Sequence, residues 1–189
     1  MVSDLIKKRR TARKFLSQPV KESDLEDIIS LARLSPSAAN LQPLKYALIT
    51  DEKIRESMFP FIRYAGYIKD WDPSFEESPK AFIALFCDTK IAKKESCECD
   101  AGIALMAISV LAEEKGLSSC IIGAVNREKV TKILNIEEDF ALLYLVGLGY
   151  CDGKSDFFDC DTDQKYRFNG SGGFSVPKRS TKEVIIKKI

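Results

Sequence analysis

The sequence predicts a single α+β domain over residues 1–189, and three observations lead to that prediction. A chain of 189 residues has the length of one ordinary domain with a sizeable core. Its composition, 45% hydrophobic and 30% charged, is typical of a globular protein. Short apolar runs alternate with segments of helical periodicity, so the strands are expected to be separated by helices.

The first half of the chain is predicted to contain one helix and two strands. Ser23 has the pattern of an N-cap for a helix that Pro36 limits at its C-terminal end. Residues 45–50 are typical of a short strand. Residues 80–87 are apolar on both faces, which predicts a central strand.

The middle of the chain predicts a buried helix. Residues 100–115 are apolar nearly all round, as in a helix enclosed by the core, and Gly116 fits its C-cap. Residues 119–124 are either a short strand or a loop. Asn126 is predicted to cap a small helix that ends at Leu134.

The last third predicts one strong strand, a loop and a tail. Residues 141–149 are a continuous apolar run and predict a strand. Residues 152–173 are polar, include four glycines and are predicted to form a long loop. Val184 to Ile186 form an apolar, strand-like tail near the end.

Charge and composition exclude several classes of function. A net charge of +1 gives no electrostatic case for nucleic acid or an anionic membrane. The chain has no histidine, which removes Ser-His-Asp and Cys-His machinery and most catalytic zinc sites. No uncharged run exceeds 12 residues, whereas a membrane span needs roughly 20, and the N-terminus does not resemble a secretory signal. We therefore expect a cytoplasmic protein.

The six cysteines are predicted to be reduced thiols without a metal. Cys97 and Cys99 form a C-x-C pair, but no second pair follows at zinc-finger spacing. A thiol or metal protein built around these two residues is the alternative, which metal analysis would decide.

Four segments have residue types suited to ligand binding. The first contains Arg9, Arg10 and Arg13, whose guanidinium groups can each donate two parallel hydrogen bonds to a phosphate. It also contains the hydroxyl of Thr11. Basic residues at a helix end are also common as solvated groups, so both interpretations are open.

The second segment runs from Pro36 to Pro43. Small side chains would let a flat ligand approach the backbone, and Asn40 and Gln42 can each donate and accept hydrogen bonds. An ordinary polar turn is the alternative.

The third and fourth segments lie in the second half of the chain. Gly123, in the run from Cys120 to Ala124, can bring a backbone N–H close to a ligand or serve as a tight packing position. Lys178 and Arg179 follow a proline and either close on an anion or belong to a solvated tail.

Taken in order, these segments resemble the nitroreductase family of flavin enzymes. The similar motifs are R-R-T-A-R-K-F, P-S-A-A-N-L-Q-P, D-A-G-I-A, L-V-G-L-G-Y and V-P-K-R-S, and they span residues 5 to 186. The resemblance implies an FMN-binding homodimer with a mixed or antiparallel central sheet flanked by helices. It further implies a C-terminal strand exchanged with the partner subunit and two active sites at the interface.

The resemblance also implies roles for individual residues. The FMN phosphate would be held by Arg9, Arg10, Thr11 and Arg13, and approached by Arg179 and Lys178. Pro36, Ser37, Ala38 and Asn40 would contact the flavin from the other subunit, with Gln42 near the ribityl chain or the interface. Ile122 and Gly123 would place backbone groups at the flavin edge.

The activity implied is hydride transfer from NADH or NADPH to a nitroaromatic, quinone or similar flat acceptor, with flavin N5 as the hydride carrier and no protein residue as acid or base. One cleft would serve both substrates, which predicts ping-pong kinetics. Lys69 is a candidate to stabilise reduced flavin, or is a surface lysine. Six aromatic residues either cover the flavin or pack in the core: Phe59, Phe61, Tyr64, Tyr67, Trp71 and Phe75.

An FMN-binding protein without nitroreductase turnover is the alternative function. It would serve storage, sensing or another flavin reaction such as dehydrogenation or dehalogenation. Anaerobic bleaching of the flavin by NADH or NADPH distinguishes the two.

Overall fold

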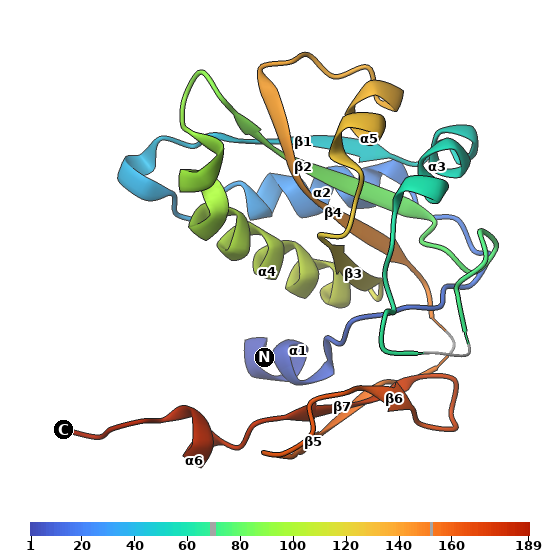
Figure 1. Ribbon diagram of the computed structural model, residues 1–189, viewed down its shortest axis with the longest axis vertical. Coiled ribbons are helices and arrows are strands. Elements are labelled where there is room, and N and C mark those ends of the chain that lie inside the picture. The colour runs from blue at the N-terminus through green and yellow to red at the C-terminus, as the bar shows by residue number, and fades with distance from the viewer. Residues whose placement is uncertain (69–70, 152) are drawn as a thin grey trace.

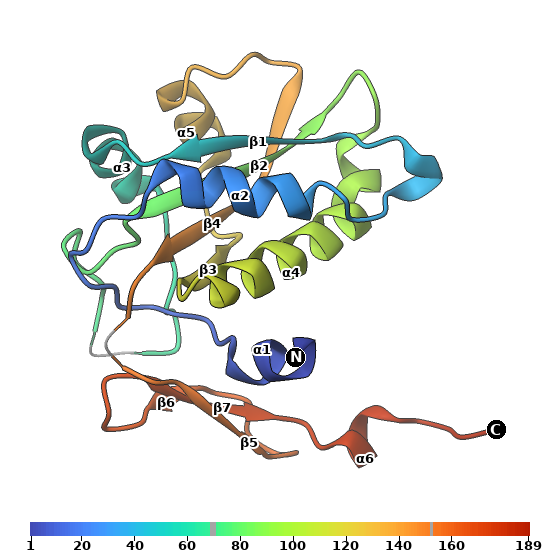
Figure 2. The ribbon, with the colours of Figure 1, turned by 180° about the vertical axis from the view of Figure 1, so that it is seen from behind.

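The fold has a four-stranded antiparallel sheet between two layers of helices, with a small second sheet below them (Figures 1 and 2). It is seen in a computed structural model that describes residues 1–68, 71–151 and 153–189. The strand order is β1-β2-β4-β3. The strands are β1 Leu44–Ile49, β2 Ala81–Asp88, β3 Ser118–Ile122 and β4 Phe140–Gly149. The predicted α+β class is confirmed.

Strand β2 is central because its side chains are apolar on both faces. It pairs with β1 on one side and β4 on the other. Ile83 and Leu85 contact the core below α2 and α4, while Phe82 and Phe86 contact the core on the opposite face. The double-sided apolar run at 80–87 therefore predicted the correct position in the sheet.

Two helices cover each face of the sheet. Helices α2 Glu22–Ala32 and α4 Glu98–Glu114 pack on one face, and α3 Glu52–Met58 and α5 Arg127–Ile133 on the other. Three short 3₁₀ turns lie between helices and strands of this sheet: η1 Ala38–Asn40, η2 Phe59–Phe61 and η3 Lys94–Cys97. None of the helices described in residues 1–68, 71–151 and 153–189 combines the length and apolar character needed to cross a bilayer.

Local signals predicted some helix ends correctly and missed one. The side chain of Asn126 accepts from the backbone N–H of Lys129, and Gly116 ends α4 with a φ of 74°. Helix α2 instead begins at Glu22, with Lys21 as an N-cap that makes no side-chain hydrogen bond. Ser23 is therefore not its cap. Burial of Leu25 in the core, rather than a capping side chain, decides where this helix lies.

Helix α4 is only partly enclosed, which corrects the expectation of a helix buried all round. Ala101, Ala104 and Ile108 are fully buried against the sheet. Ile103 and Met106, which are three residues apart on the other face, are each 39% exposed. The apolar residues on this second face are therefore only partly covered by the described residues of the chain.

The predicted loop at 152–173 contains two strands, so that prediction was wrong. Strands β5 Asp156–Asp159 and β6 Arg167–Phe168 flank β7 Phe174–Lys178 in a second sheet, here called the C-terminal sheet. The four glycines of residues 152–173 led to the prediction of a loop instead of this sheet. A Cβ atom at Gly173 would lie 2.8 Å from the backbone nitrogen of Ser155, so glycine is needed where two backbone segments approach closely.

The residues predicted as a strand-like tail form no strand: Val184 ends a short helix, and residues 185–189 have no regular secondary structure. Ser180 caps α6 Thr181–Val184 by accepting from the backbone N–H of Glu183. Val184 is 60% exposed and Ile186 is 99% exposed. Among the described residues, the apolar tail pairs with no strand of its own chain, and its pairing with a partner stays a prediction.

One pair of cysteines differs from the prediction of six reduced thiols. Cys87, at the end of β2, is disulfide-bonded to Cys97, the residue before α4. Both side chains are fully buried, and the fold brings their Cα atoms to 6.5 Å. The partner of Cys97 is therefore distant in sequence and could not be found from the C-x-C spacing with Cys99.

Gly147 provides a direct test of packing between β4 and the loop before β2. A Cβ atom there would lie 2.8 Å from Cβ of Pro79 and 3.3 Å from the ring of Phe82. We expect Gly147→Ala to lower the free energy of unfolding by about 1–3 kcal/mol, the usual cost of overpacking. Urea titration measures it. Gly102→Ala, where a new Cβ meets nothing within 4 Å, is the control, and an equal loss in both variants would contradict the packing explanation.

Candidate functional site

The N-terminal arginine segment lies between α1 Val2–Lys8 and the start of β3. Thr11 forms a parallel bridge with Ser119, and the backbone N–H of Ala12 donates to the Ser119 carbonyl at 2.9 Å. These backbone contacts fix the segment at the edge of the main sheet. The arginine side chains on either side of Thr11 are thereby held close to the C-terminal sheet below.

Arg13 is the most enclosed of these arginines, with 9% of its surface exposed. Its guanidinium lies 3.5 Å from the ring centre of Tyr166 and 5.1 Å from that of Phe174. One nitrogen donates to the Thr11 carbonyl at 3.0 Å. Aromatic stacking orients the flat guanidinium and leaves its other N–H groups available to an anion.

Arg9 and Arg10 end α1 and have incompletely used donors. Arg10 donates to the carbonyls of Lys7 and Arg9, both at 2.6 Å, and lies 4.6 Å above the ring of Phe157. The Nε atoms of Arg9 and Arg10 are buried and have no hydrogen-bond partner. Burial, together with the neighbouring charge of Arg9, lowers the pKa of Arg10.

Lys178, at the end of β7, completes a group of four cations that we call the cationic cluster: Arg9, Arg10, Arg13 and Lys178. Partial burial and the charges of the three arginines lower the pKa of Lys178. No ion pair involves a member of the cluster in the part of the chain that the structure describes. Four like charges with no ion-pair partner and one nearby acid, Glu113, favour binding of an anion.

A cavity of about 400 Å³ adjoins the cluster. It lies between the arginine segment and the C-terminal sheet, and Arg10, Arg13 and Phe174 form part of its wall. Lys8 and Lys154 add further positive charge, Lys14 is paired with Glu77 at 2.8 Å, and one acid, Glu113, lines the cavity. Its size and charge suit a phosphate group with part of the molecule attached to it.

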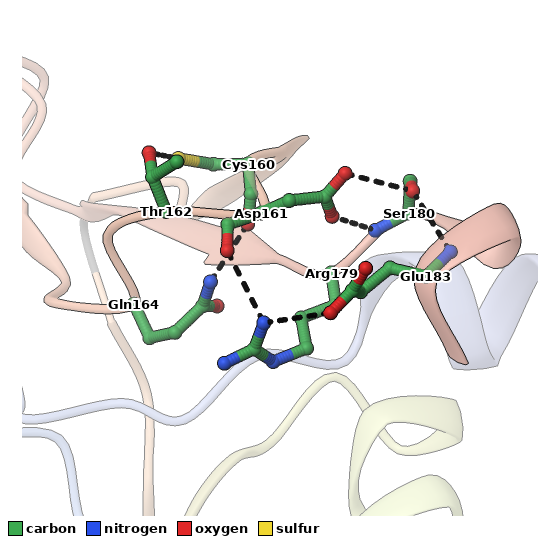
Figure 3. Close-up of polar contacts among 7 residues, drawn as sticks. All are labelled: Cys160, Asp161, Thr162, Gln164, Arg179, Ser180 and Glu183. Carbon is green, nitrogen blue, oxygen red and sulfur yellow. Dashed lines mark hydrogen bonds and ion pairs between the residues drawn. The ribbon is translucent and has the colours of Figure 1, made fainter.

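Arg179 lies in a different hydrogen-bond network from the cluster (Figure 3). Its guanidinium donates to the Asp161 carbonyl at 3.1 Å and pairs with the Glu183 carboxylate at 3.4 Å. The Asp161 carboxylate accepts from the backbone N–H and the hydroxyl of Ser180. The structure thus brings Lys178 to the arginines, and it engages Arg179 at the start of α6.

The segment 36–43 has an unusual backbone between α2 and β1. Ala39, Asn40 and Gln42 have φ values of 49°, 53° and 53°, in the left-handed region. Such conformations cost of order 1–3 kcal/mol each in non-glycine residues and are concentrated at functional sites. A simple polar turn would not need three of them, so this geometry favours the ligand-binding interpretation.

Two hydrogen bonds to the core anchor this segment, which we call the 36–43 loop. The backbone N–H of Ala38 donates to the Asp100 carboxylate at 3.0 Å, and the backbone N–H of Asp88 donates to the Pro43 carbonyl at 2.8 Å. Asp100 is in the first turn of α4 and is only 4% exposed. Sequence reasoning did not assign Asp100 a role, and the two acids in the first turn of this apolar helix, Glu98 and Asp100, do not by themselves show which one is buried.

The 36–43 loop and the cationic cluster lie at opposite ends of α4. Ala38 binds the first turn of that helix, whereas Arg10 and Glu113, from its last turn, line the same cavity. Seventeen helical residues at 1.5 Å each separate the two ends by about 25 Å. The two predicted binding segments of one chain are therefore too far apart for both to contact the phosphate group of the same ligand.

The third predicted segment lies along β3, whose start is near Thr11. Ile122 is buried at its end, and Gly123 follows as an exposed residue. Arg127 donates to the carbonyls of Gly123 and Leu143, at 3.3 and 3.0 Å, and so holds this turn. A ligand extending from the cationic cluster along β3 would meet the backbone of Gly123.

The six aromatic residues divide among separate contacts rather than forming one group. Phe59 and Phe75 pack against each other at 5.7 Å, and Phe61 and Tyr64 pack against the core. Tyr67 contacts Tyr166, and Trp71 contacts Phe168 and Phe174. Lys69 lies outside the described residues. The aromatic partners of the arginines were not predicted: Phe157 and Tyr166 lie in the segment predicted as a loop, and Phe174 directly follows it.

The two cysteines of the metal alternative lie in different environments. Cys97 is buried and bonded to Cys87, whereas Cys99 is exposed. Across residues 1–68, 71–151 and 153–189, no three side chains of the metal-binding types converge.

The fold is shared with solved structures of nitroreductase family proteins. A nitroreductase family protein from Streptococcus pneumoniae TIGR4 superposes with a TM-score of 0.70 over the full length of both chains, at 21% identity. An FMN-dependent nitroreductase from Clostridium difficile R20291 has a TM-score of 0.66 and 22% identity, covering 87% of this chain and 97% of that one.

The chain belongs to the nitroreductase family, whose model matches residues 6–150. It is 27% identical over 171 residues to an iodotyrosine deiodinase from Thermotoga neapolitana, covering 80% of this chain and 89% of the relative. It is 35% identical over 80 residues to a chloronitrobenzene nitroreductase from Comamonas testosteroni, covering 42% and 35%. Family membership makes the protein an oxidoreductase, as the motifs predicted.

Proposed function

We propose that the protein is an FMN-dependent oxidoreductase that transfers hydride from NADH or NADPH to a nitroaromatic, quinone or similar flat acceptor. The observation that supports this most directly is the cationic cluster. Four cations with two buried, unpartnered Nε atoms need an anion with several oxygen acceptors, and a phosphate monoester has them. The sequence contains no G-x-G-x-x-G, which favours FMN over a dinucleotide cofactor.

FMN, when bound, would supply the two-electron chemistry. The residues of this chain would bind and orient it. Arg9, Arg10, Arg13 and Lys178 would hold the phosphate, with the Thr11 hydroxyl beside them and Arg179 released from Glu183 if it takes part. The backbone of Ile122 and Gly123 would meet the far edge of the cofactor. Histidine is not required, because solvent can deliver the protons.

We propose a homodimer in which Pro36, Ser37, Ala38, Asn40 and Gln42 complete the partner subunit's site. The separation of about 25 Å along α4 supports this arrangement. So do the partly exposed apolar side chains of Ile103 and Met106 on α4 and the exposed tail around Ile186. Exchange of the C-terminal segment between subunits belongs to the same proposal, as does a cytoplasmic location.

Ping-pong kinetics are expected if donor and acceptor use one cleft in turn. Initial rates measured against NADH or NADPH at several acceptor concentrations should give parallel double-reciprocal lines. Intersecting lines with evidence for a ternary complex would contradict the shared cleft. The acceptor panel should include nitroaromatics and quinones, and also halogenated phenols, since one relative is named a deiodinase.

Anaerobic mixing with each nucleotide tests the enzymatic proposal itself. Purified protein is expected to be yellow, to release FMN rather than FAD on denaturation, and to bleach with NADH or NADPH. Protein that holds FMN but does not bleach would favour the alternative of a flavin-binding protein without nitroreductase turnover.

A further inference from the structure

We propose that Asp100 is a positioning residue that holds the 36–43 loop in its binding conformation and thereby acts on the site of the partner subunit. This inference rests on the proposed function, because the loop is taken to contact FMN across the dimer. Asp100 itself touches neither cofactor nor substrate in that arrangement. Its effect passes through one hydrogen bond, from the backbone N–H of Ala38 to the carboxylate at 3.0 Å.

The loop's own hydrogen bonds are all local, so none of them ties it to the core. Two join its backbone, from the N–H of Asn40 to the Ser37 carbonyl and from the N–H of Leu41 to the Ala38 carbonyl, both at 3.0 Å. Ser37 accepts from the backbone N–H of Gln42 at 3.0 Å, and the Gln42 amide donates to the Asn40 carbonyl at 3.3 Å. Both side-chain contacts are exposed, and the loop that they help to hold has three residues in the left-handed region. Exposed hydrogen bonds contribute little net free energy, so they are poorly suited to maintain strained backbone alone.

Asp100 can be such an anchor because it is rigid and buried. It lies in the first turn of a 17-residue helix, where a carboxylate is favoured by the helix dipole, and it is 4% exposed. The disulfide between Cys87 and Cys97 joins the residue before this helix to β2, and β2 also holds Pro43 through Asp88. Both anchors of the loop therefore belong to one rigid unit of the core.

Loss of the anchor should weaken FMN binding because the free loop would relax from its strained conformation. FMN would then have to restore that conformation on binding. We expect Asp100→Leu to weaken FMN binding about 10- to 100-fold, the range of a hydrogen bond to a charged group. Asp100→Asn keeps an acceptor oxygen and should recover most of the affinity. Ser109→Ala, which removes a buried hydrogen bond to Leu105 on the same helix, is the matched control with unchanged affinity.

A second variant removes the donor without touching α4. Ala38→Pro deletes the N–H, and the extended Ser37 before it, at φ −133° and ψ 157°, is compatible with a following proline. The loss should match that of Asp100→Leu. Combining both changes should cause no additional loss, because they remove the same hydrogen bond. Fully additive losses would overturn the proposed route through Ala38.

Mixed dimers test whether Asp100 acts across the interface. Differently tagged Asp100→Leu and Arg13→Ala subunits are co-purified, and tight FMN sites are counted by fluorescence titration. If the loop serves the partner, the site on the Arg13→Ala subunit also receives the loop of the Asp100→Leu subunit and has both defects. The site on the Asp100→Leu subunit then has a wild-type Arg13 and a wild-type loop, so half of the sites bind FMN tightly. No tight site in the mixed dimer, or wild-type affinity in Asp100→Leu, would overturn the proposal. A wild-type protein that binds no FMN would instead reject the proposed function.

Discussion

Truncation of the chain after Gly173 is expected to lower FMN affinity and to shift the protein from dimer to monomer at the same time. The cut removes β7, which pairs with both β5 and β6, so the C-terminal sheet cannot form. It also removes Lys178 from the cationic cluster and Phe174, which is 2% exposed, from beside Arg13.

The expected size of the effect follows from these contacts. Losing one charged hydrogen bond of Lys178 and the ordered position of Arg13 should weaken FMN binding by about 3–6 kcal/mol. The exposed apolar residues Val184 to Ile186, if buried against a partner, would contribute roughly 1.5–3 kcal/mol each to the dimer before ordering costs. Sedimentation and flavin fluorescence measure the two losses on the same samples.

A shorter truncation separates the two roles of this segment. A chain ending at Ser180 keeps β7 and Lys178 but lacks α6 and the apolar tail. It should lose dimer stability and retain more of its FMN affinity than the chain ending at Gly173. If the chain ending at Gly173 stays dimeric and binds FMN as tightly as the full-length protein, the C-terminal segment contributes neither to dimer formation nor to FMN binding.

Arg13→Ala is expected to weaken FMN binding by about 1.5–3 kcal/mol, or roughly ten- to more than a hundredfold. Arg13 is the most buried member of the cationic cluster, and Tyr166 and Phe174 hold its guanidinium in place. Arg13→Lys should give an intermediate loss, because lysine keeps the charge but lacks the flat group that stacks on the rings.

The control for Arg13→Ala is another arginine that lies over an aromatic ring. Arg167 is exposed and lies 5.9 Å from the ring centre of Phe158, outside the cluster. Arg167→Ala removes a charge and a ring contact of the same kind, so general electrostatic effects should be equal in both variants. Equal FMN affinities of the two variants in a fluorescence titration would remove Arg13 from the site.

The sequence alone was sufficient for the elements whose burial is continuous and local. The double-sided apolar run at β2 and the run at β4 predicted their places in the sheet because fully buried strands need apolar residues on both faces. Asn126 and Gly116 predicted helix ends because capping involves only neighbouring residues. The ordered motifs predicted the family, which the match over residues 6–150 confirms.

Only the tertiary structure decided which of those residues meet. Lys178 joins Arg13 because β7 folds back under the N-terminal segment, and Arg179, the next residue, pairs with Glu183 instead. Asp100 meets Ala38 across 62 positions of sequence, and Cys97 meets Cys87 rather than Cys99. Such contacts depend on long-range packing of β2, α4 and the C-terminal sheet, whereas periodicity and capping patterns report only what lies within a few residues.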